Sequence, residues 1–315
     1  MQSEPAEIRH IKKKKPIRWL LLVGVIIYVL FLYVLNASQP GHSVEGCAQG
    51  CATTDEREPG PLRLVSLNML HGFPSFTDLA VRLDLIGSEL QRLEADIVLL
   101  QEVPWTRRTG NGAKALAVRL GYNYLYYRAN GNRRLIFFEE GEAILSRFPL
   151  KDIAFTELQP QMGFFESRVS LGASAVTPYG DLAVFSVHLT DKNPQVREGQ
   201  ATSLKQFVES HTSGSAVVAG DFNAGESSPI IMELTADWRD TYRTQHPDDP
   251  GLTCCIDNLQ AGPDEALEER IDYIFLVPKD TPAITVQKVF DQPFTIDGDW
   301  QWASDHLGLM VELMP

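Results

Sequence analysis

From residue 62 onward the chain is a succession of short apolar runs, and this succession restricts the fold more than any other feature. The runs lie at residues 63–68, 95–101, 143–145, 169–176, 182–189, 216–219, 271–277 and 307–313. Each is too short for a helix and is bounded by glycine or polar residues, which is typical of a buried β-strand. Helical spacing of apolar residues occurs between only some of them, at 78–93, 114–120 and 196–211. Strands joined so often without a helix do not fit a simple doubly wound sheet, so the pattern predicts an α/β fold of two packed sheets flanked by helices.

Residues 62–315 fit the upper size range of one such domain, and the chain shows no internal repeat. The composition, 44% hydrophobic and 22% charged residues, is ordinary for a globular protein with a large core. Residues 36–61 differ from the domain because they are rich in Gly, Ser, Pro and charge. That composition predicts a linker ahead of a single catalytic domain.

The N-terminal segment predicts a membrane anchor. Residues 1–18 are polar and basic, with four consecutive lysines at 12–15, and residues 19–35 carry no charge. The uncharged run reaches the lower length limit for a membrane-spanning helix. A cleaved signal peptide is the alternative, with residues 36–38 as a loose cleavage site, but its apolar region is usually about 7–15 residues long. Length favours an uncleaved signal anchor, with residues 1–18 in the cytoplasm and the catalytic domain outside.

The net charge of −13 argues against a broad nucleic-acid footprint. Residues 1–18 are net positive, so the remainder of the chain is more acidic than this total. Proteins that bind a phosphate backbone by charge alone are basic. An acidic domain can still act on phosphates when a metal ion supplies the positive charge.

The four cysteines permit disulfides in an oxidising compartment. They are Cys47, Cys51 and the adjacent pair Cys254 and Cys255. Four cysteines allow three pairings, and the sequence does not choose among them. The spacings do not suit a zinc site, which typically uses paired CxxC units.

Polar residues fall at the ends of the apolar runs with unusual regularity. They are Asn68, Glu102, His188, Asp221, Asn223 and Asp272, with Asp305 and His306 directly before the last run. Each has an ordinary alternative reading, such as a turn residue for Asn68 or a core histidine for His188. Because several strands end in such residues, we expect them to converge at one rim of the sheets.

Asp221 and Asn223 illustrate the chemistry of this set. Their i, i+2 spacing after Gly220 places a carboxylate and a carboxamide on one face of extended backbone. Such a pair suits a hydrated divalent cation or the positioning of a water molecule. The same residue types also form Asx-turns and helix caps, so the tetrapeptide alone leaves both readings open.

The ordered motifs together resemble the endonuclease/exonuclease/phosphatase superfamily, which includes pancreatic-type DNases and neutral sphingomyelinases. The motifs are SLN (66–68), QE (101–102), ILSR (144–147), VHL (187–189), GDFN (220–223), RIDYI (270–274) and SDH (304–306). The resemblance covers residues 62–312. It implies a DNase I-like, four-layer α/β sandwich and Mg²⁺- or Mn²⁺-dependent cleavage of a phosphoester.

The resemblance also implies a role for each motif residue. Glu102 would be the principal metal ligand, helped by Asn68 and, directly or through water, by Asp305. Asp221 and Asn223 would position or activate the attacking water. His306 would pair with Asp272 and contact the scissile phosphate, and His188 would donate to a non-bridging oxygen. The general base stays open between Asp221 and His306.

The substrate is less well defined than the reaction. Phospholipid, a small phosphoester and nucleic acid are all compatible with the motifs, and nothing points to a protein partner. Candidate phosphate contacts are Arg133, Arg134, Arg147 and Arg168, whereas Glu139, Glu140 and Glu142 count against a polyanion. Trp300 and Trp302 could stack on a base, touch lipid or cover the core. We expect a membrane-anchored, extracytoplasmic phosphoesterase that favours a lipid headgroup or small phosphoester. The alternatives are a nuclease of the same superfamily and a catalytically silent binding module with the same fold.

Overall fold

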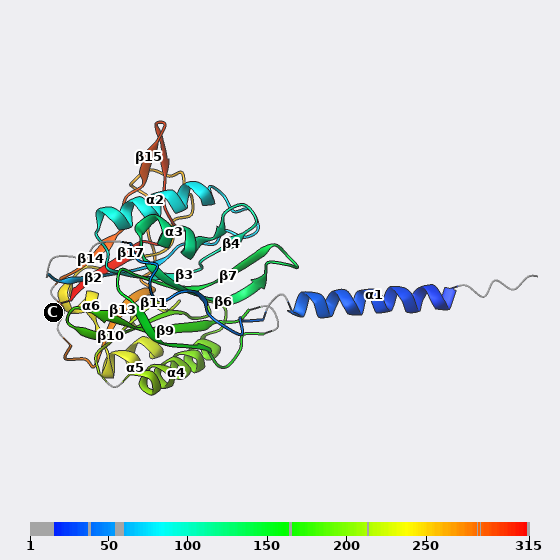
Figure 1. Cartoon of the computed structure of the whole chain (residues 1–315), viewed down its shortest axis with the longest axis horizontal. Helices are drawn as coiled ribbons and strands as arrows, with labels where there is room; N and C mark the ends of the chain where they lie inside the picture. The colour runs from blue at the N-terminus through cyan, green and yellow to red at the C-terminus, as the bar shows by residue number, and fades with distance from the viewer. Residues whose placement is uncertain are drawn as a thin grey trace, which may run out of the picture.

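Two β-sheets pack face to face, and helices cover the outer face of each (Figure 1). This computed structural model describes residues 16–36, 39–53, 60–163, 166–212, 214–281, 283 and 285–313. The first sheet has the strand order β1-β6-β7-β3-β2-β17-β14, with β4 and β5 attached beside β7. The second has the order β12-β13-β11-β10-β9-β8. Both are mixed sheets, so the predicted four-layer α/β sandwich is confirmed.

The strands of the first sheet come from the N-terminal half and the C-terminal end of the chain. They are β1 (Glu45–Cys47), β2 (Leu62–Asn68), β3 (Ile97–Gln101), β4 (Trp105–Thr106), β5 (Gly110–Asn111), β6 (Asn123–Asn132), β7 (Phe138–Ser146), β14 (Thr285–Val289) and β17 (Gly308–Leu313). Helices α2 (Leu79–Arg92) and α3 (Gly112–Leu120) lie over its outer face. Alternate residues of β2 serve the two faces: Val65 and Leu67 pack under these helices, whereas Leu62 and Leu64 face the second sheet.

The second sheet is built from the middle of the chain. Its strands are β8 (Leu150–Glu157), β9 (Val169–Thr177), β10 (Gly180–His188), β11 (Ala216–Asp221), β12 (Arg239–Asp240) and β13 (Asp272–Val277). Helices α4 (Pro194–His211) and α5 (Pro229–Asp237) cover its outer face, and α6 (Thr241–Gln245) follows β12. Val217 and Ala219 of β11 face the first sheet, and Ala216 and Val218 face the helices. Strands buried on both faces explain the continuous apolar runs in the sequence.

Each sheet contains one parallel pair, and each pair is joined by a helix. β2 and β3 are parallel and connected through α2, and β10 and β11 are parallel and connected through α4. The carboxyl ends of parallel strands meet at the same edge of a sheet. The two β-α-β units therefore deliver the residues after β2, β3, β10 and β11 to one rim of the sandwich.

Helix α1 (Pro16–Asn36) extends away from the sandwich (Figure 1). Its 18-residue window Ile17–Val34 is apolar enough to cross a membrane, and 0% of that window is buried. A signal sequence near the N-terminus meets the same criterion. Residues 1–15 of the basic segment and residues 37–38 of the possible cleavage site lie outside the described residues. The basic segment and the cleavage site therefore stay predictions.

The structure differs from the predicted linker at 36–61. Glu45–Cys47 forms β1, which pairs antiparallel with β6 at the edge of the first sheet. Further contacts hold this segment to the domain: the Gly41 amide donates to the Arg128 carbonyl at 2.8 Å, and the Thr53 amide to the Gly121 carbonyl at 3.0 Å. A disulfide joins Cys47 to Cys51. Within the described residues, the linker is thus largely an edge strand with its flanks.

Candidate active site

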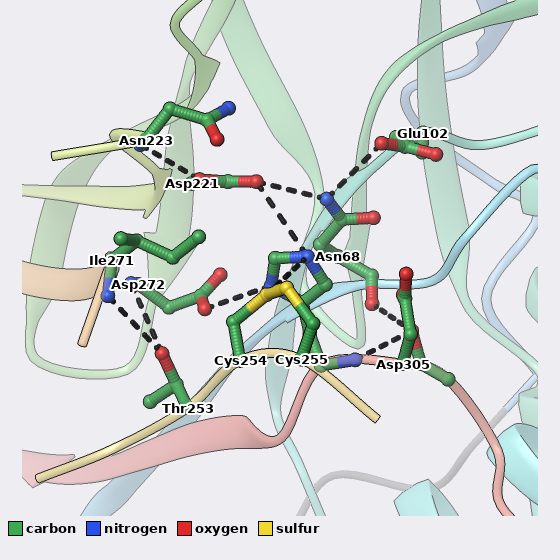
Figure 2. Close-up of a disulfide and its surroundings, with 12 residues drawn as sticks. Asn68, Glu102, Asp221, Asn223, Thr253, Cys254, Cys255, Ile271, Asp272 and Asp305 are labelled. Carbon is green, nitrogen blue, oxygen red and sulfur yellow. Dashed lines mark hydrogen bonds and ion pairs between the residues drawn. A yellow bond between two sulfur atoms is a disulfide. The ribbon is translucent and has the colours of Figure 1, made fainter. Parts of the chain in front are cut away.

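The rim residues are linked across the two sheets by Asn68. It ends β2, Glu102 follows β3, and Asp221 ends β11. The Asn68 side-chain nitrogen donates to Asp221 Oδ2 at 3.0 Å and to Glu102 Oε1 at 3.3 Å. Asn68 is 1% exposed, so its bond to Asp221 is shielded from water, whereas the bond to Glu102 is partly buried. One amide thus connects the acids of the two sheets (Figure 2).

Strand pairing brings a second acid and two imidazoles to Asp221. In register, Asp221 lies between His188 of β10 and Asp272 of β13. His188 Nε2 is 3.3 Å from Asp221 Oδ2, and His306 Nε2 is 3.9 Å from the same oxygen. His306 Nδ1 lies 2.9 Å from Asp272 Oδ2. The structure therefore brings the predicted Asp272–His306 pair together, and the other ring nitrogen of His306, Nε2, faces Asp221.

The turn after β11 holds Asn223 beside the same group. Asn223 has a φ of 49° and its backbone amide donates to Asp221 Oδ1 at 2.8 Å. Its side-chain nitrogen donates to the Leu189 carbonyl at 2.9 Å and lies 3.0 Å from His188 Nε2. The Asx-type turn of the alternative reading is present, and it faces the cluster of acids. The cation- or water-binding reading of the tetrapeptide stays a prediction.

Glu102 is held as an anion. Burial opposes its ionisation, but the charges of His71, His188 and Arg168 outweigh burial and lower the pKa of Glu102 to about 2. The His71 amide also donates to Glu102 Oε2 at 3.1 Å. Asp305 behaves in the opposite way, because burial and the nearby Glu102 charge raise the pKa of its carboxyl. The Glu102 charge thus disfavours ionisation of Asp305, and a bound cation would relieve this repulsion.

The two histidines differ in charge. Burial lowers the pKa of His306, but the carboxylates of Asp272, Asp221 and Asp305 raise it overall to well above its usual range. For His188, burial and the Arg168 guanidinium lower the pKa well below the usual range. Burial and the Asp272 charge raise the pKa of Asp221 to about 7. The rim therefore holds one imidazolium and one neutral imidazole on either side of a carboxyl that titrates near neutrality.

The donor set fits a hard divalent cation. Glu102 and Asp305 offer carboxylate oxygens, which suit Mg²⁺ or Mn²⁺. Asn68 fits less directly, because its oxygen accepts from the Leu70 amide at 3.1 Å while its nitrogen faces the acids. A ligand role for Asn68 requires rotation of the amide by about half a turn. A second group, formed by Asp221, Asp272 and His306, also has ligand atoms within 4.8 Å of one another.

Several supporting residues escaped the sequence analysis. Arg82 of α2 is 0% exposed and donates to the carbonyls of Met69 and Leu70 at 2.8 Å and of Ala303 at 3.2 Å. It thereby joins the loop after β2 to the loop before β17. Ser304 adds to this connection by donating to the Asn68 carbonyl at 2.6 Å. The signal for Arg82 was its place on the apolar face of an amphipathic helix, where a charge needs buried partners.

A pocket of about 360 Å³ opens beside Glu102. Its lining combines aromatic, acidic and basic side chains: His71, Phe73, Glu102, Asn130, Phe138, Glu140, Glu166, Arg168 and Lys192. Of the predicted arginine candidates, Arg168 lies here, with Nη1 3.0 Å from the His188 ring nitrogens. Arg147 instead pairs with Asp96 at 3.1 Å, and Arg133 pairs with Glu139 at 2.7 Å. A separate cavity of about 430 Å³ beside Phe76 and Phe137 contains none of the predicted site residues.

The acidic run ahead of ILSR does not face the solvent. Glu139, Glu140 and Glu142 are 3%, 6% and 1% exposed. Glu139 pairs with Arg128 and Arg133, and Glu140 accepts from Asn130 at 2.5 Å. Trp302 is also buried, whereas Trp300 is 43% exposed on the hairpin formed by β15 (Phe294–Ile296) and β16 (Asp299–Gln301).

A four-layer sandwich with acids, amides and imidazoles gathered at one rim is the fold of a phosphoesterase. Residues 65–306 match the Endonuclease/Exonuclease/phosphatase family, so the chain belongs to that family, as its motifs suggested. The sequence has no match among curated proteins.

Solved structures of the family share the architecture. A family protein of Bacteroides thetaiotaomicron has a TM-score of 0.64 at 18% identity, with 82% of this chain and 96% of that chain covered. The mannosyl-6-phosphatase of the same organism gives 0.63 at 18%, covering 80% and 98%. Truncated TDP2 of Caenorhabditis elegans gives 0.61 at 17%, covering 81% and 98%. Identities this low show a shared fold and no more.

Proposed function

We propose that this protein is a membrane-anchored, extracytoplasmic phosphoesterase that depends on a divalent metal ion. The observation that supports the proposal is the connected arrangement of Glu102, Asn68 and Asp221, which the Asp272–His306 pair approaches. Every residue that the motifs assign to the reaction is present at this rim. An intact set supports catalysis over a silent binding module.

Glu102 and Asp305 would hold Mg²⁺ or Mn²⁺. Such an ion, when bound, offsets the negative charge that develops on phosphate oxygens. A bound cation would favour the ionised form of Asp305, whose pKa burial and the Glu102 charge raise in its absence. The ion would also explain how a net acidic domain attracts a phosphoester.

The remaining residues divide the proton chemistry. Asp272 holds His306 through Nδ1, so Nε2, which now contacts the Cys254 sulfur, would donate to a phosphate oxygen when substrate is bound. Asp221 would accept the proton of the attacking water, because Asn223 and Asn68 fix its orientation and its Oδ2 faces both histidines. Neutral His188 and Arg168 would donate to a non-bridging oxygen. Of the two candidates for the general base, this arrangement favours Asp221.

The pocket beside Glu102 favours a small phosphoester or a lipid headgroup over nucleic acid. Its basic groups, Arg168 and Lys192, are each paired with Glu166, so it offers little unbalanced positive charge to a polyanion. Phe73 and Phe138 stack in the pocket wall with ring centroids 4.6 Å apart. A phosphomonoester, or a phosphodiester in which one of the two ester groups is compact, suits this lining.

The full chain in detergent micelles provides the test, with bis-p-nitrophenyl phosphate, phospholipid vesicles and DNA as substrates. We expect activity that requires Mg²⁺ or Mn²⁺ and disappears with EDTA. Asp221→Ala and His306→Ala should each reduce kcat by at least about 10³-fold. His211→Ala, at the exposed end of α4, is the matched control and should leave activity unchanged. Activity that survives EDTA or either active-site substitution would exclude the proposal.

A further inference from the structure

Figure 2 shows the Cys254–Cys255 disulfide beside Asp272 and Asp305. Its Cys254 sulfur contacts the imidazole of the Asp272–His306 pair. Cys254 is 0% exposed, and its Sγ is 3.5 Å from His306 Nε2, the nitrogen that faces Asp221. Cys255 is exposed. One sulfur of the pair is thus accessible to a reagent while the other touches the imidazole.

The segment that carries the disulfide is bonded to both parts of the Asp272–His306 pair. On one side, the amides of Thr253 and Cys254 donate to the Glu269 carbonyl at 2.8 and 3.0 Å. The Thr253 hydroxyl accepts from the amides of Ile271 and Asp272, each at 3.3 Å, so it fixes the start of β13.

On the other side, the same segment is bonded to the loop that carries His306. The Leu307 amide donates to the Thr253 carbonyl, and the Ile256 amide donates to the Asp305 carbonyl, both at 2.8 Å. Residues 253–256 therefore set the distance between two side chains whose atoms meet at 2.9 Å.

We propose that the Cys254–Cys255 disulfide is a positioning element for the Asp272–His306 pair, and that its reduction lowers turnover. The proposal rests on the phosphoesterase function proposed above. The covalent link removes rotational freedom from two adjacent side chains. Once it is opened, the Cys254 thiol can turn and compete with the substrate for His306 Nε2. A displacement of about 1 Å at such a site can cost about 100-fold in rate.

The reductant would be a dithiol. One of its thiolates attacks the exposed Cys255 sulfur, the S–S bond breaks, and the Cys254 sulfur leaves and takes up a proton. The second thiol of the reductant then displaces Cys255 from the mixed disulfide. Two electrons and two protons pass to the protein, and the reductant leaves as its cyclic disulfide.

The experiment compares the oxidised and dithiothreitol-reduced full chain in detergent micelles at saturating Mg²⁺. Peptide mass mapping establishes which disulfide has opened. We expect kcat to fall by about tenfold to 100-fold with KM little changed, and to recover on reoxidation. The melting temperature should change little on reduction. If the disulfide had a purely structural role, reduction would instead lower the melting temperature together with kcat.

Two paired variants locate the effect. Cys47→Ser/Cys51→Ser removes the remote disulfide and should respond to dithiothreitol as the wild type does. Cys254→Ser/Cys255→Ser should have low kcat and no response. An unchanged kcat after mapped reduction of the adjacent pair overturns the proposal, as does loss of the response in the Cys47→Ser/Cys51→Ser variant.

A readout without substrate separates this proposal from the function on which it rests. In ¹⁵N-histidine spectra, the His306 ring signals should move on reduction while those of His211 stay fixed. If no phosphoester is hydrolysed in either redox state but the His306 signals move, the proposed function fails and the positioning role stands. Fixed His306 signals overturn the positioning role itself.

Discussion

Asp221 contacts four polar side chains or amides at the rim of the sandwich. Its two oxygens meet the Asn223 amide and the Asn68 side chain, and the rings of His188 and His306 lie within 4 Å. With Asp272 opposite on the neighbouring strand, this is a coupled group of acids and imidazoles. Substitution of one member is therefore expected to change the behaviour of the others.

Asp272→Asn tests this coupling. The amide keeps the shape of the side chain but removes the charge that orients and protonates His306. We expect kcat to fall by about 10³- to 10⁴-fold with little change in KM. Steady-state kinetics with bis-p-nitrophenyl phosphate measures both kcat and KM. The double variant with His306→Ala should be no slower than His306→Ala alone, and additive losses would contradict a shared role.

Glu142→Gln is expected to stabilise the protein at neutral pH. Burial raises the pKa of Glu142 well above its usual range, and its carboxyl contacts Ser186 at 2.5 Å. The unfolded chain ionises this group near pH 4.3, whereas the folded protein keeps the proton, so stability is lost as pH rises above that value. Each unit of elevation corresponds to about 1.4 kcal/mol.

Thermal unfolding at two pH values checks the prediction. The side-chain oxygen of glutamine can accept from the Ser186 hydroxyl as the carboxyl does, so the variant should melt a few degrees higher at pH 7.5. The difference should shrink toward zero at pH 4, where both chains are neutral at this position. A variant that melts lower at pH 7.5 would show that Glu142 is ionised in the fold.

At the residue level, the sequence predicted the polar residues at the strand ends. It did not predict the residues whose hydrogen bonds hold those strand ends in place. Asn68, Glu102 and Asp221 could be found because strand ends are visible as local pattern. Arg82 and Thr253 act through backbone carbonyls and amides of distant segments, and such contacts leave no periodicity in the sequence. The meeting of these side chains was therefore predictable from the sequence, whereas the residues that hold them in place were not.

Among the elements, the parallel strands β10 and β11 approach each other closely at Gly220. Gly220 of β11 has a φ of 151°, and a Cβ at this position would lie 1.9 Å from the Val187 carbonyl oxygen of β10. Val187 and Gly220 are in register one step before His188 and Asp221. The close approach of the two strands is thus what sets the spacing between those two side chains.

Gly220→Ala should separate the strands and damage both stability and activity. Because backbone cannot give way as a flexible side chain does, we expect a loss of more than about 2 kcal/mol. Thermal unfolding and kcat measure the two effects. Gly225→Ala is the matched control, since a Cβ there meets nothing within 4 Å. Equal effects of the two substitutions would contradict the argument.

Strand β7 shows where local pattern misleads. The sequence predicts a short strand at 143–145, whereas β7 runs from Phe138 to Ser146. Its first half contains the three glutamates, whose charge argued against a polyanionic substrate. Arg128, Asn130 and Ser186 satisfy them from other strands. Burial of a charge depends on such partners, which only the assembled sheet supplies.

Considered as a whole, the molecule is strongly acidic, and this predicts its response to salt. With Mg²⁺ held constant, raising NaCl from about 20 to about 200 mM screens repulsion between the domain and a polyanion. We expect kcat/KM for DNA to rise or stay level, and that for bis-p-nitrophenyl phosphate to change little. A steep fall for DNA would instead indicate a basic footprint and a nuclease.

The order of strands in the two sheets could not be obtained from the sequence pattern alone. Local periodicity identifies β17 but not its place beside β2, which lies at the other end of the domain. The family resemblance predicted the four-layer sandwich but not this strand order. Likewise, the composition of residues 36–61 predicted a linker. β1 has only three residues, too few to be recognised as a strand from the sequence pattern.

The attachment of residues 39–53 to the sheet edge determines how far the catalytic domain can travel. α1 ends at Asn36, and the Pro40 carbonyl already accepts from Arg128 at 3.1 Å. Four residues span at most about 14 Å. If α1 crosses a bilayer, this short connection confines the domain to a thin layer above the lipid. Its encounters would then follow the two-dimensional density of what lies in or on that surface, and not the concentration in the surrounding fluid.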